Sequence, residues 1–325
     1  ILIFFLLLWL FSKSLWVFVS IITIAIAWRE VENIIPFNFS STFTVQKKTN
    51  SIRVMSWNVE QFDIMQHKTH PEVKEKMLEL INQFQPDIAC FQEMVGGDDD
   101  KAINYLGDIK RKLKFKSYYY SYDVRLDFDN DHHFGVLIFS KLPMLKRQTI
   151  SVYPYDYNSI FQYVDVLANA DTLRVFNIHL QSLKFNRSNF QYLDHPHFKS
   201  DSSLQNSKNI ISKLKSGFLK RSLQANTIKN EMNKSPYPVI ICGDFNDVPN
   251  SYAYSKIGKN MQNAFVEKGA GIGRTFSKIA PTLRIDNIFT DKNFTIDQYV
   301  RIKKELIDHY PIIADITVTS NGFAK

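Results

Sequence analysis

Short apolar segments follow one another along the chain after residue 50, and several neighbours have no helical segment between them. Each is five to eight residues long, with polar or turn-forming residues on both sides. Runs of this length and composition are typical of buried β-strands. We therefore predict strands over residues 52–58, 88–92, 135–140, 161–167, 173–180, 239–243, 285–290 and 312–317.

Helical spacing occurs in fewer places. Apolar residues recur every three or four positions between Glu72 and Phe84, which predicts a helix over that range. Two more helices are predicted over 98–113 and 204–232. A doubly wound parallel sheet needs a helix between successive strands, and several strand pairs here lack one. The pattern therefore predicts the α/β class with a mixed sheet or a two-sheet sandwich.

The first 28 residues are almost wholly apolar. Residues 1–11 are an unbroken apolar run, Ser12-Lys13-Ser14 interrupts it, and apolar residues resume over 15–28. Both runs are apolar on every face, which is typical of sequence embedded in a membrane. A membrane-spanning helix needs about 20 apolar residues, and neither run reaches that length. We expect residues 1–29 to be a membrane anchor of one or two transmembrane segments, truncated at its amino terminus, and we favour two segments joined by a tight turn at Lys13.

Two alternatives remain for this segment: one bent span with Lys13 at the membrane surface, or a signal peptide. No small-residue cleavage site follows Ala27, which disfavours the signal peptide. Positive residues lie both between the apolar runs and after them, so the charge pattern leaves the side of the membrane open.

Residues 30–50 contain Pro36 and a Ser40-Ser41-Thr42 run, and we predict a linker there. Residues 51–325 then form one large domain. Lys and Arg outnumber Asp and Glu by 40 to 32, and this positive excess favours partners that carry phosphate. The two cysteines are too few for a disulfide scaffold or a cysteine-ligated metal cluster.

Polar residues are concentrated where the predicted strands begin or end. Any one of these residues alone would be unremarkable, but rigid sheets present functional groups at strand ends. The set comprises Asn58, Glu93 after Gln92, His179, the segment Gly243-Asp244-Phe245-Asn246, Asp286 after Arg284-Ile285, and Asp308-His309 before Pro311.

In this order and spacing, these residues resemble the endonuclease/exonuclease/phosphatase superfamily, whose fold is DNase I-like. The resemblance covers about residues 51–317, and Arg221 and Gln224 look like the family's Arg-x-x-Gln pair. It implies a four-layer α/β sandwich with the active site across the top of two packed sheets. The apolar amino terminus, His-Leu-Gln-Ser at 179–182 and Ser-Tyr-Ala-Tyr at 251–254 look like a bacterial membrane-anchored subgroup. That narrower likeness implies a protein of the bacterial inner membrane.

Carboxylate and amide oxygens suit Mg²⁺, with Mn²⁺ as an alternative, and the resemblance implies that Asn58, Glu93 and Asp308 bind the metal. Asp244 would orient or deprotonate the attacking water, and Asn246 would hydrogen-bond the phosphoryl group. The resemblance leaves open whether Asp244 or His309 takes the proton.

His179 is expected to donate to the phosphate, and Asp286 is expected to fix the tautomer of His309. Arg221 and Gln224 are expected to support the substrate. Two residues depart from the family pattern, because Ile307 stands where relatives usually carry Ser and Asn287 stands where an aromatic residue is common.

The sequence thus predicts a membrane-anchored, metal-dependent hydrolase of phosphate esters, with phosphodiesters favoured over monoesters. The substrate would be nucleic acid or a phospholipid or sphingolipid headgroup, and no obligate protein partner is inferred. The alternative is a catalytically inactive module of the same fold that binds nucleic acid or membrane.

Overall fold

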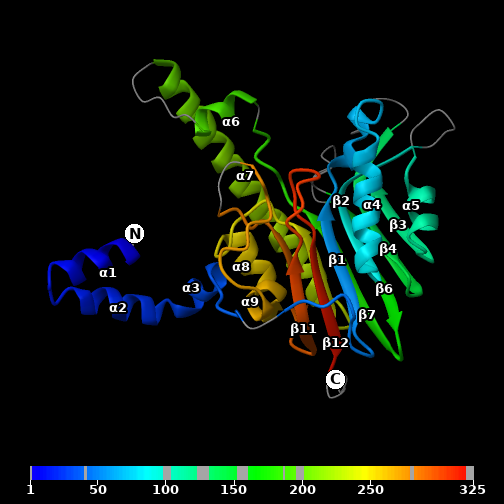
Figure 1. Cartoon of the computed structure of the whole chain (residues 1–325), viewed down its shortest axis with the longest axis horizontal. Coiled ribbons are helices and arrows are strands. Elements are labelled where there is room, and N and C mark those ends of the chain that lie inside the picture. The colour runs from blue at the N-terminus through cyan, green and yellow to red at the C-terminus, as the bar shows by residue number, and fades with distance from the viewer. Residues whose placement is uncertain are drawn as a thin grey trace.

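Two six-stranded mixed sheets form the centre of the protein in the computed structural model (Figure 1). The structure describes residues 2–39, 42–97, 104–122, 132–151, 160–185, 187–194, 201–278 and 282–319. The first sheet has the order β11-β12-β1-β2-β4-β3. Its strands are β1 at Ile52–Asn58, β2 at Ile88–Gly97, β3 at Ser117–Tyr122, β4 at His132–Ser140, β11 at Phe294–Arg301 and β12 at Ile312–Val318.

The second sheet has the order β5-β6-β7-β8-β10-β9. Its strands are β5 at Met144–Ser151, β6 at Ile160–Ala168, β7 at Asp171–His179, β8 at Val239–Asp244, β9 at Met261–Asn263 and β10 at Asp286–Asp291. Each sheet contains one parallel pair, β1 with β2 and β7 with β8. The predicted α/β class with a two-sheet sandwich is confirmed.

Three hydrophobic cores separate four layers. Val54 and Ile88 of the first sheet pack against Val175 and Ile240 of the second. The outer face of the first sheet is covered by α4 at Glu72–Phe84 and α5 at Leu106–Lys112. The outer face of the second sheet is covered by α7 at Asp201–Asn233 and α8 at Tyr252–Gly258. The layers are therefore helix, sheet, sheet and helix, as the resemblance implied.

Several elements differ from the predicted ones. Strands β3, β5, β9 and β11 were not predicted, because their polar or half-exposed residues hide the apolar pattern. The helix predicted over 98–113 is α5, which begins at Leu106, and residues 98–103 lie outside the described part of the chain. Short elements η1 at Glu60–Gln66, α6 at Arg187–Asp194 and α9 at Ala264–Lys268 complete the chain.

The amino-terminal segment forms three short helices, α1 at Leu2–Phe11, α2 at Val17–Ile26 and α3 at Trp28–Ile34. The first two extend away from the sandwich (Figure 1). Lys13, with a φ of 51°, lies in the turn between them. Ten helical residues span only ~15 Å, whereas a bilayer's hydrocarbon core is ~30 Å thick.

Among the described residues, no helix combines the length and apolarity that crossing a membrane requires. The structure therefore does not support the predicted transmembrane segments. The physical reason is the turn at Ser12-Lys13-Ser14, which divides the apolar sequence into two helices of 10 residues each.

The segment after α2 contacts the sandwich. The Asn33 side chain donates to Asn250 Oδ1 at 3.0 Å, and Asn250 donates to the carbonyl of Glu30 at 2.8 Å. The Arg284 guanidinium donates to the carbonyl of Ile34 at 3.1 Å. These contacts connect α3 to the loop that follows β8 and to the segment just before β10.

Candidate active site

Four predicted site residues meet at one edge of the sandwich because the strand register places them there. Asn58 is the last residue of β1, and His179 lies opposite Asp244 where the parallel strands β7 and β8 end. Asp286 begins the antiparallel strand β10 and lies opposite Asp244 on its other side. All four side chains are buried. The sandwich therefore brings these groups together at a fixed edge, as predicted.

Glu93 lies within β2 rather than at its end, which corrects the predicted strand boundary at residue 92. The pairing of β2 with β4 is interrupted between Phe91 and Met94, and Glu93 has a φ of 51°. A β-bulge of this kind turns a side chain away from the regular alternation. As a result Glu93 Oε1 accepts a hydrogen bond from Asn58 Nδ2 at 3.1 Å.

Both carboxylate oxygens of Asp244 accept hydrogen bonds. Its Oδ1 accepts from the backbone N–H of Asn246 at 2.7 Å, and its Oδ2 accepts from the side-chain amides of Asn58 and Asn246, each at 3.2 Å. Gly243 immediately before it has a φ of 148°, and a Cβ there would lie 1.9 Å from the carbonyl oxygen of Ile178. This glycine allows β7 and β8 to approach closely beside the catalytic edge.

His309 lies between two carboxylates. Its Nδ1 is 3.0 Å from Asp286 Oδ2, and its Nε2 is 3.7 Å from Asp244 Oδ2. The Phe276 ring contacts the imidazole with its centroid 4.9 Å away, and Thr275 Oγ1 accepts from the backbone N–H of Asp286 at 3.0 Å. The predicted Asp286–His309 pair is present in the structure.

A hydrogen bond between buried side chains connects the two sheets behind this edge. Gln92 Nε2 donates to Asn177 Oδ1 at 2.7 Å, and Asn177 in turn donates to the carbonyls of Phe91 and Leu137. Both side chains are completely buried. Asn177 was missed as a supporting residue, although its position two residues before His179 in the same strand was a usable signal.

Burial and the neighbouring charges shift the pKa values at the site. Burial, reinforced by Asp286, raises the pKa of Asp244 to about 6. Burial also raises the pKa of Glu93, partly opposed by the Asn58 hydrogen bond. Burial acts to lower the pKa of His309, but Asp286 and Asp244 outweigh it and raise that pKa to about 10. His309 is therefore a cation at neutral pH, between carboxylates that are crowded together.

Asp308 lines the same cavity as Glu93 but has different partners. Its carboxylate forms an ion pair with Lys278 at 3.0 Å, and its backbone N–H donates to Glu60 Oε2 at 3.4 Å. Burial acts to raise the pKa of Asp308, but His309 and Lys278 lower it. Burial and Asp308 raise the pKa of Glu60 to about 7. Glu60 and Lys278 were missed, although Glu60 follows Asn58 by two residues.

Arg221 and Gln224 on α7 form hydrogen bonds with the main chain of the segment that follows His179. Arg221 pairs with Asp247 at 3.0 Å and donates to the carbonyl of Gln181, and Gln224 Oε1 accepts from the N–H of Gln181 at 2.9 Å. They therefore hold the segment that follows His179. Arg221 also lines the active-site cavity.

The edge that carries these residues opens into a cavity of about 450 Å³. Glu93, Asp244, Asn246 and His309 line it, and much of the rest of its lining is apolar. The apolar lining residues are Leu183, Phe185, Leu214, Val248, Phe276, Leu283 and Ile285.

Residues 55–307 match the family model described as "Endonuclease/Exonuclease/phosphatase family". The chain belongs to this family. The match spans more than half of the sequence and contains every predicted site residue except His309 and Asp308, which follow it directly. No curated protein sequence matches the chain.

Solved structures of the same fold share little sequence with this family member. An endonuclease/exonuclease/phosphatase from Beutenbergia cavernae is 15% identical, with a TM-score of 0.59 over 82% of this chain and 72% of its own. A humanized D. rerio TDP2 is 16% identical, with a TM-score of 0.57 over 83% of this chain and 100% of its own. The human Nocturnin catalytic domain is 17% identical, with a TM-score of 0.55 over 87% of this chain and 99% of its own. At these identities the likeness extends to the fold alone.

The two departures from the family pattern leave the His309 pair intact. Asn287 is buried beneath the site, where its Oδ1 accepts from Asn263 at 3.0 Å and its amide donates to the carbonyl of Ile285. Ile307 packs against the core of the first sheet. Neither side chain replaces a group that contacts His309 or Asp286.

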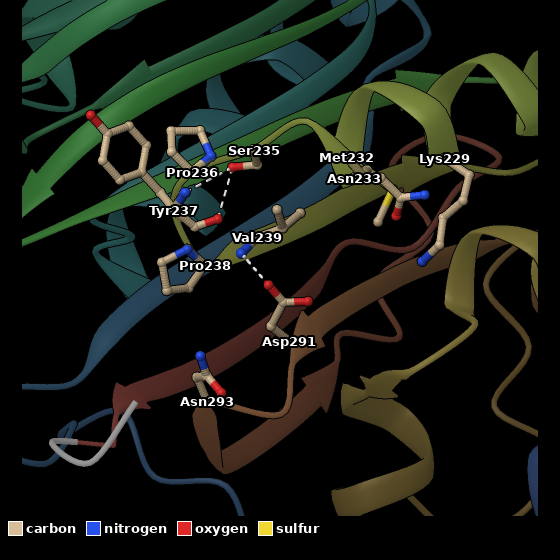
Figure 2. Close-up of a pocket in the computed structure, with 10 residues that line it drawn as sticks. All are labelled: Lys229, Met232, Asn233, Ser235, Pro236, Tyr237, Pro238, Val239, Asp291 and Asn293. Carbon is tan, nitrogen blue, oxygen red and sulfur yellow. Dashed lines mark hydrogen bonds between the residues drawn. The ribbon is translucent and has the colours of Figure 1, made fainter. Parts of the chain in front are cut away.

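Another cavity, of about 390 Å³, lies at the opposite end of β8 (Figure 2). Lys229 there donates to the carbonyls of Ile257 and Lys259, and Asp291 accepts from the N–H of Val239 at 2.8 Å. Its two charged groups are thus engaged with the main chain. This cavity lacks the cluster of carboxylates and histidines that marks the catalytic edge.

Proposed function

We propose that this protein is a divalent-metal-dependent phosphodiesterase that acts at a membrane surface. The observation that carries the proposal is that Glu93, Asp244, Asn246 and His309 line one cavity, with Asp286 hydrogen-bonded to His309. Hydrolysis of a phosphodiester needs cations for the phosphoryl oxygens, a positioned water and stabilisation of the leaving oxygen. These residues supply a candidate for each requirement.

The carboxylates at this edge fit a hard cation. Glu93, Asp244 and Asp286 are crowded together, and Asp286 Oδ1 is buried without a hydrogen-bond partner among the described residues. Ligand atoms of Asp244, Asp286 and His309 lie within 4.8 Å of one another, but the imidazolium already occupies the space between those two carboxylates. We therefore assign the metal to Glu93. Asn58 donates through Nδ2 to Glu93 and accepts at Oδ1 from the N–H of Glu60 at 3.2 Å, so it would position the Glu93 carboxylate.

Mg²⁺ is the cation that best suits these oxygen ligands, and Mn²⁺ is the alternative. When bound, such a cation would polarise the phosphoryl oxygens and neutralise their charge. Asp308 lines the same cavity as Glu93, but its carboxylate pairs with Lys278, so we do not assign it as a metal ligand.

Asp244 would be the group that orients and deprotonates the attacking water. Its pKa of about 6 leaves it ionised at neutral pH, and three donors fix its orientation. His309 is protonated between Asp244 and Asp286 and would serve as a cationic donor to the phosphate rather than as the base. His179, whose Nε2 is 3.6 Å from both Glu93 and Asp244, would be the second histidine to contact the phosphate.

A phospholipid or sphingolipid headgroup is the substrate class that we favour, with nucleic acid as the alternative. The apolar wall of the cavity, including Leu183, Phe185 and Leu214, would accommodate an apolar group next to the scissile phosphate. Two cations line the cavity, Arg221 and Lys184, and Arg221 already pairs with Asp247. Lys278 lies outside the lining and pairs with Asp308. A strand of nucleic acid would require a longer row of available cations.

The apolar helices α1 and α2 support association with a bilayer. Many apolar side chains of these helices and of the turn between them are exposed, with 65% of Phe4, 86% of Phe11, 80% of Leu15 and 81% of Ile26 accessible. Exposed apolar surface of this extent marks a site of membrane or protein contact. Since each helix is ~15 Å long, the hairpin would enter about one leaflet of the bilayer.

A panel of phosphodiesters tests the proposal with the full chain. The panel contains bis-p-nitrophenyl phosphate, single-stranded and duplex DNA, RNA, sphingomyelin and phosphatidylcholine vesicles, each with Mg²⁺, with Mn²⁺ and with EDTA. We expect metal-dependent turnover, fastest on a lipid substrate. Binding without turnover of any phosphodiester would instead support a catalytically inactive module of this fold.

A further inference from the structure

A cavity of about 520 Å³ next to the active site carries a cluster of cations that the proposed reaction does not use. It lies between the loop at residues 270–274 and the chain that follows β11, and it is lined by Arg274, Arg301 and Lys303. None of its lining residues lines the catalytic cavity. The cavity is therefore a separate site.

Arg274 and Arg301 have no carboxylate partner in the part of the chain that the structure describes. Arg301 donates to the carbonyl of Arg274, and Arg274 donates to the carbonyl of Ser277. Among the described residues neither guanidinium forms an ion pair, and Arg274 Nε is buried without a hydrogen-bond partner. Burial and the nearby Arg274 charge lower the pKa of Arg301.

The carboxylate of Glu305 also lines this cavity, but it accepts a hydrogen bond from the Tyr310 hydroxyl at 2.9 Å. Three cations therefore face one carboxylate. A bound anion would relieve the repulsion between the two guanidinium groups, and guanidinium forks match the geometry of phosphate oxygens.

Exposed aromatic residues adjoin this cationic cavity. Gly271 donates to the carbonyl of Pro36 at 2.9 Å, and Phe37 forms a β-bridge with Ala270. Phe37 stacks on Trp28 with centroids 6.3 Å apart, and 50% of Trp28 and 54% of Phe37 remain accessible.

A smaller cavity of about 260 Å³ continues this surface toward Phe39, which is 76% accessible. It shares Ala270 and Arg301 with the cationic cavity. Aromatic and basic residues therefore adjoin one another directly after the apolar hairpin. This combination is typical of protein surfaces that lie at the level of lipid headgroups.

We propose that Arg274, Arg301 and Lys303 bind the phosphate of an anionic phospholipid headgroup, while Trp28, Phe37 and Phe39 lie at the bilayer interface. This inference rests on the membrane association proposed above and names its lipid. The headgroup in this site is not the one hydrolysed, because the catalytic residues line another cavity. The site holds the protein on anionic membrane next to its active site.

The test measures binding of the full chain to vesicles of phosphatidylcholine alone and to vesicles of phosphatidylcholine with phosphatidylglycerol. We expect binding to the anionic vesicles to be ~10-fold tighter. The double variant Arg274→Gln/Arg301→Gln should lose this preference while still binding phosphatidylcholine and hydrolysing bis-p-nitrophenyl phosphate. Lys303→Gln, an exposed change, should lose part of the preference even if the double variant fails to fold.

The matched control is Lys76→Gln/Arg147→Gln, which removes two exposed cations elsewhere and should keep the preference. If the control variant and the site variants lose the preference for anionic vesicles equally, the inference is overturned, because such a result indicates nonspecific charge attraction. Equal binding of the unmodified protein to both vesicle types would also overturn it, while the proposed membrane association would stand. Binding to neither vesicle type would overturn both.

Discussion

Asp244 has a more constrained environment than any other carboxylate that we assign to the reaction. It is buried, three hydrogen bonds fix its two oxygens, and its pKa is raised to about 6. Replacement by Asn keeps the size of the side chain but removes the base. We expect Asp244→Asn to lower kcat by ~10²–10⁴-fold, the range for loss of general-base catalysis.

Asp244→Asn also removes a buried negative charge. We therefore expect the melting temperature of the variant to equal or exceed that of the unmodified protein. Thermal denaturation monitored by circular dichroism checks this expectation. Asp171→Asn, at the opposite end of β7, is the matched control and should retain activity. An Asp244→Asn enzyme with unchanged kcat would rule out its assignment as the base.

The pKa shifts also predict a pH profile. As pH falls through about 6, Asp244 takes up a proton and the rate should fall, whereas His309 should stay protonated until pH approaches 10. The kcat/KM profile for bis-p-nitrophenyl phosphate should therefore have an acid limb near pH 6. An acid limb near the ordinary aspartate value of 3.8 would contradict the assignment.

The effects on folding stability have a definite sign. The raised pKa of His309 means that the folded state binds its proton more tightly, so this contribution is complete below pH 6.5 and is lost as pH rises through about 10. The raised pKa of Asp244 makes its ionisation unfavourable to the folded state, so stability from this group decreases as pH rises from 3.8 to about 6.

At the residue level, the sequence predicted the groups that the strand ends present, such as Asn58, Asp244 and Asp286. It could not predict Glu60 or Lys278, because their roles depend on the pairing of Asp308 across distant segments. The bulge that turns Glu93 toward Asn58 was likewise invisible, since it is defined by the strand opposite.

Among the secondary-structure elements, the contact between β7 and β8 depends on one glycine. A Cβ at Gly243 would lie 1.9 Å from Ile178 O, and the φ of 148° disfavours any other residue. We expect Gly243→Ala to destabilise the fold by at least ~1–3 kcal/mol, the usual cost of a strained backbone position. Urea denaturation measures the change, with lower activity expected because His179 and Asp244 lie beside this contact.

Gly107→Ala is the matched control, because nothing lies within 4 Å of a Cβ at that position. It lies in α5, where alanine is favoured over glycine, so we expect equal or greater stability. A Gly243→Ala protein as stable as this control would contradict the close approach of the two strands.

Fully buried strands with mostly apolar residues, such as β1 and β8, were predictable from sequence. Strands at or near a sheet edge were not, because β5 and β3 present polar or half-exposed side chains that weaken the apolar signal. The helices α1 and α2 are a case in which the structure does not support the prediction. Their composition predicted transmembrane segments, but the turn at Lys13 divides them into helices of 10 residues.

At the scale of the whole molecule, the apolar hairpin and the sandwich should have separable roles. We expect the variant Phe4→Ser/Phe11→Ser/Leu15→Ser/Ile26→Ser to lose vesicle binding, because these highly exposed side chains would supply the buried apolar area. Its rate on bis-p-nitrophenyl phosphate should be unchanged, since α1 and α2 extend away from the sandwich (Figure 1) and none of their residues lines the catalytic cavity.

Vesicle flotation checks this expectation. The control variant Met65→Ser/Leu145→Ser removes exposed apolar side chains from the sandwich and should still float with vesicles. If the hairpin variant floats as well as the unmodified protein, the hairpin is not the membrane-binding element.

The central claim is that Glu93 holds a divalent metal that the hydrolysis of phosphodiesters requires. The most direct measurement is the initial rate of bis-p-nitrophenyl phosphate hydrolysis as a function of Mg²⁺ concentration, for the full chain and for Glu93→Gln, with exposed Glu79→Gln as control.

We predict no turnover in EDTA, a rate that saturates with Mg²⁺, and a half-saturating concentration raised at least ~10-fold by Glu93→Gln but not by Glu79→Gln. Turnover that persists in EDTA, or a Glu93→Gln curve that coincides with that of the unmodified protein, would contradict the account.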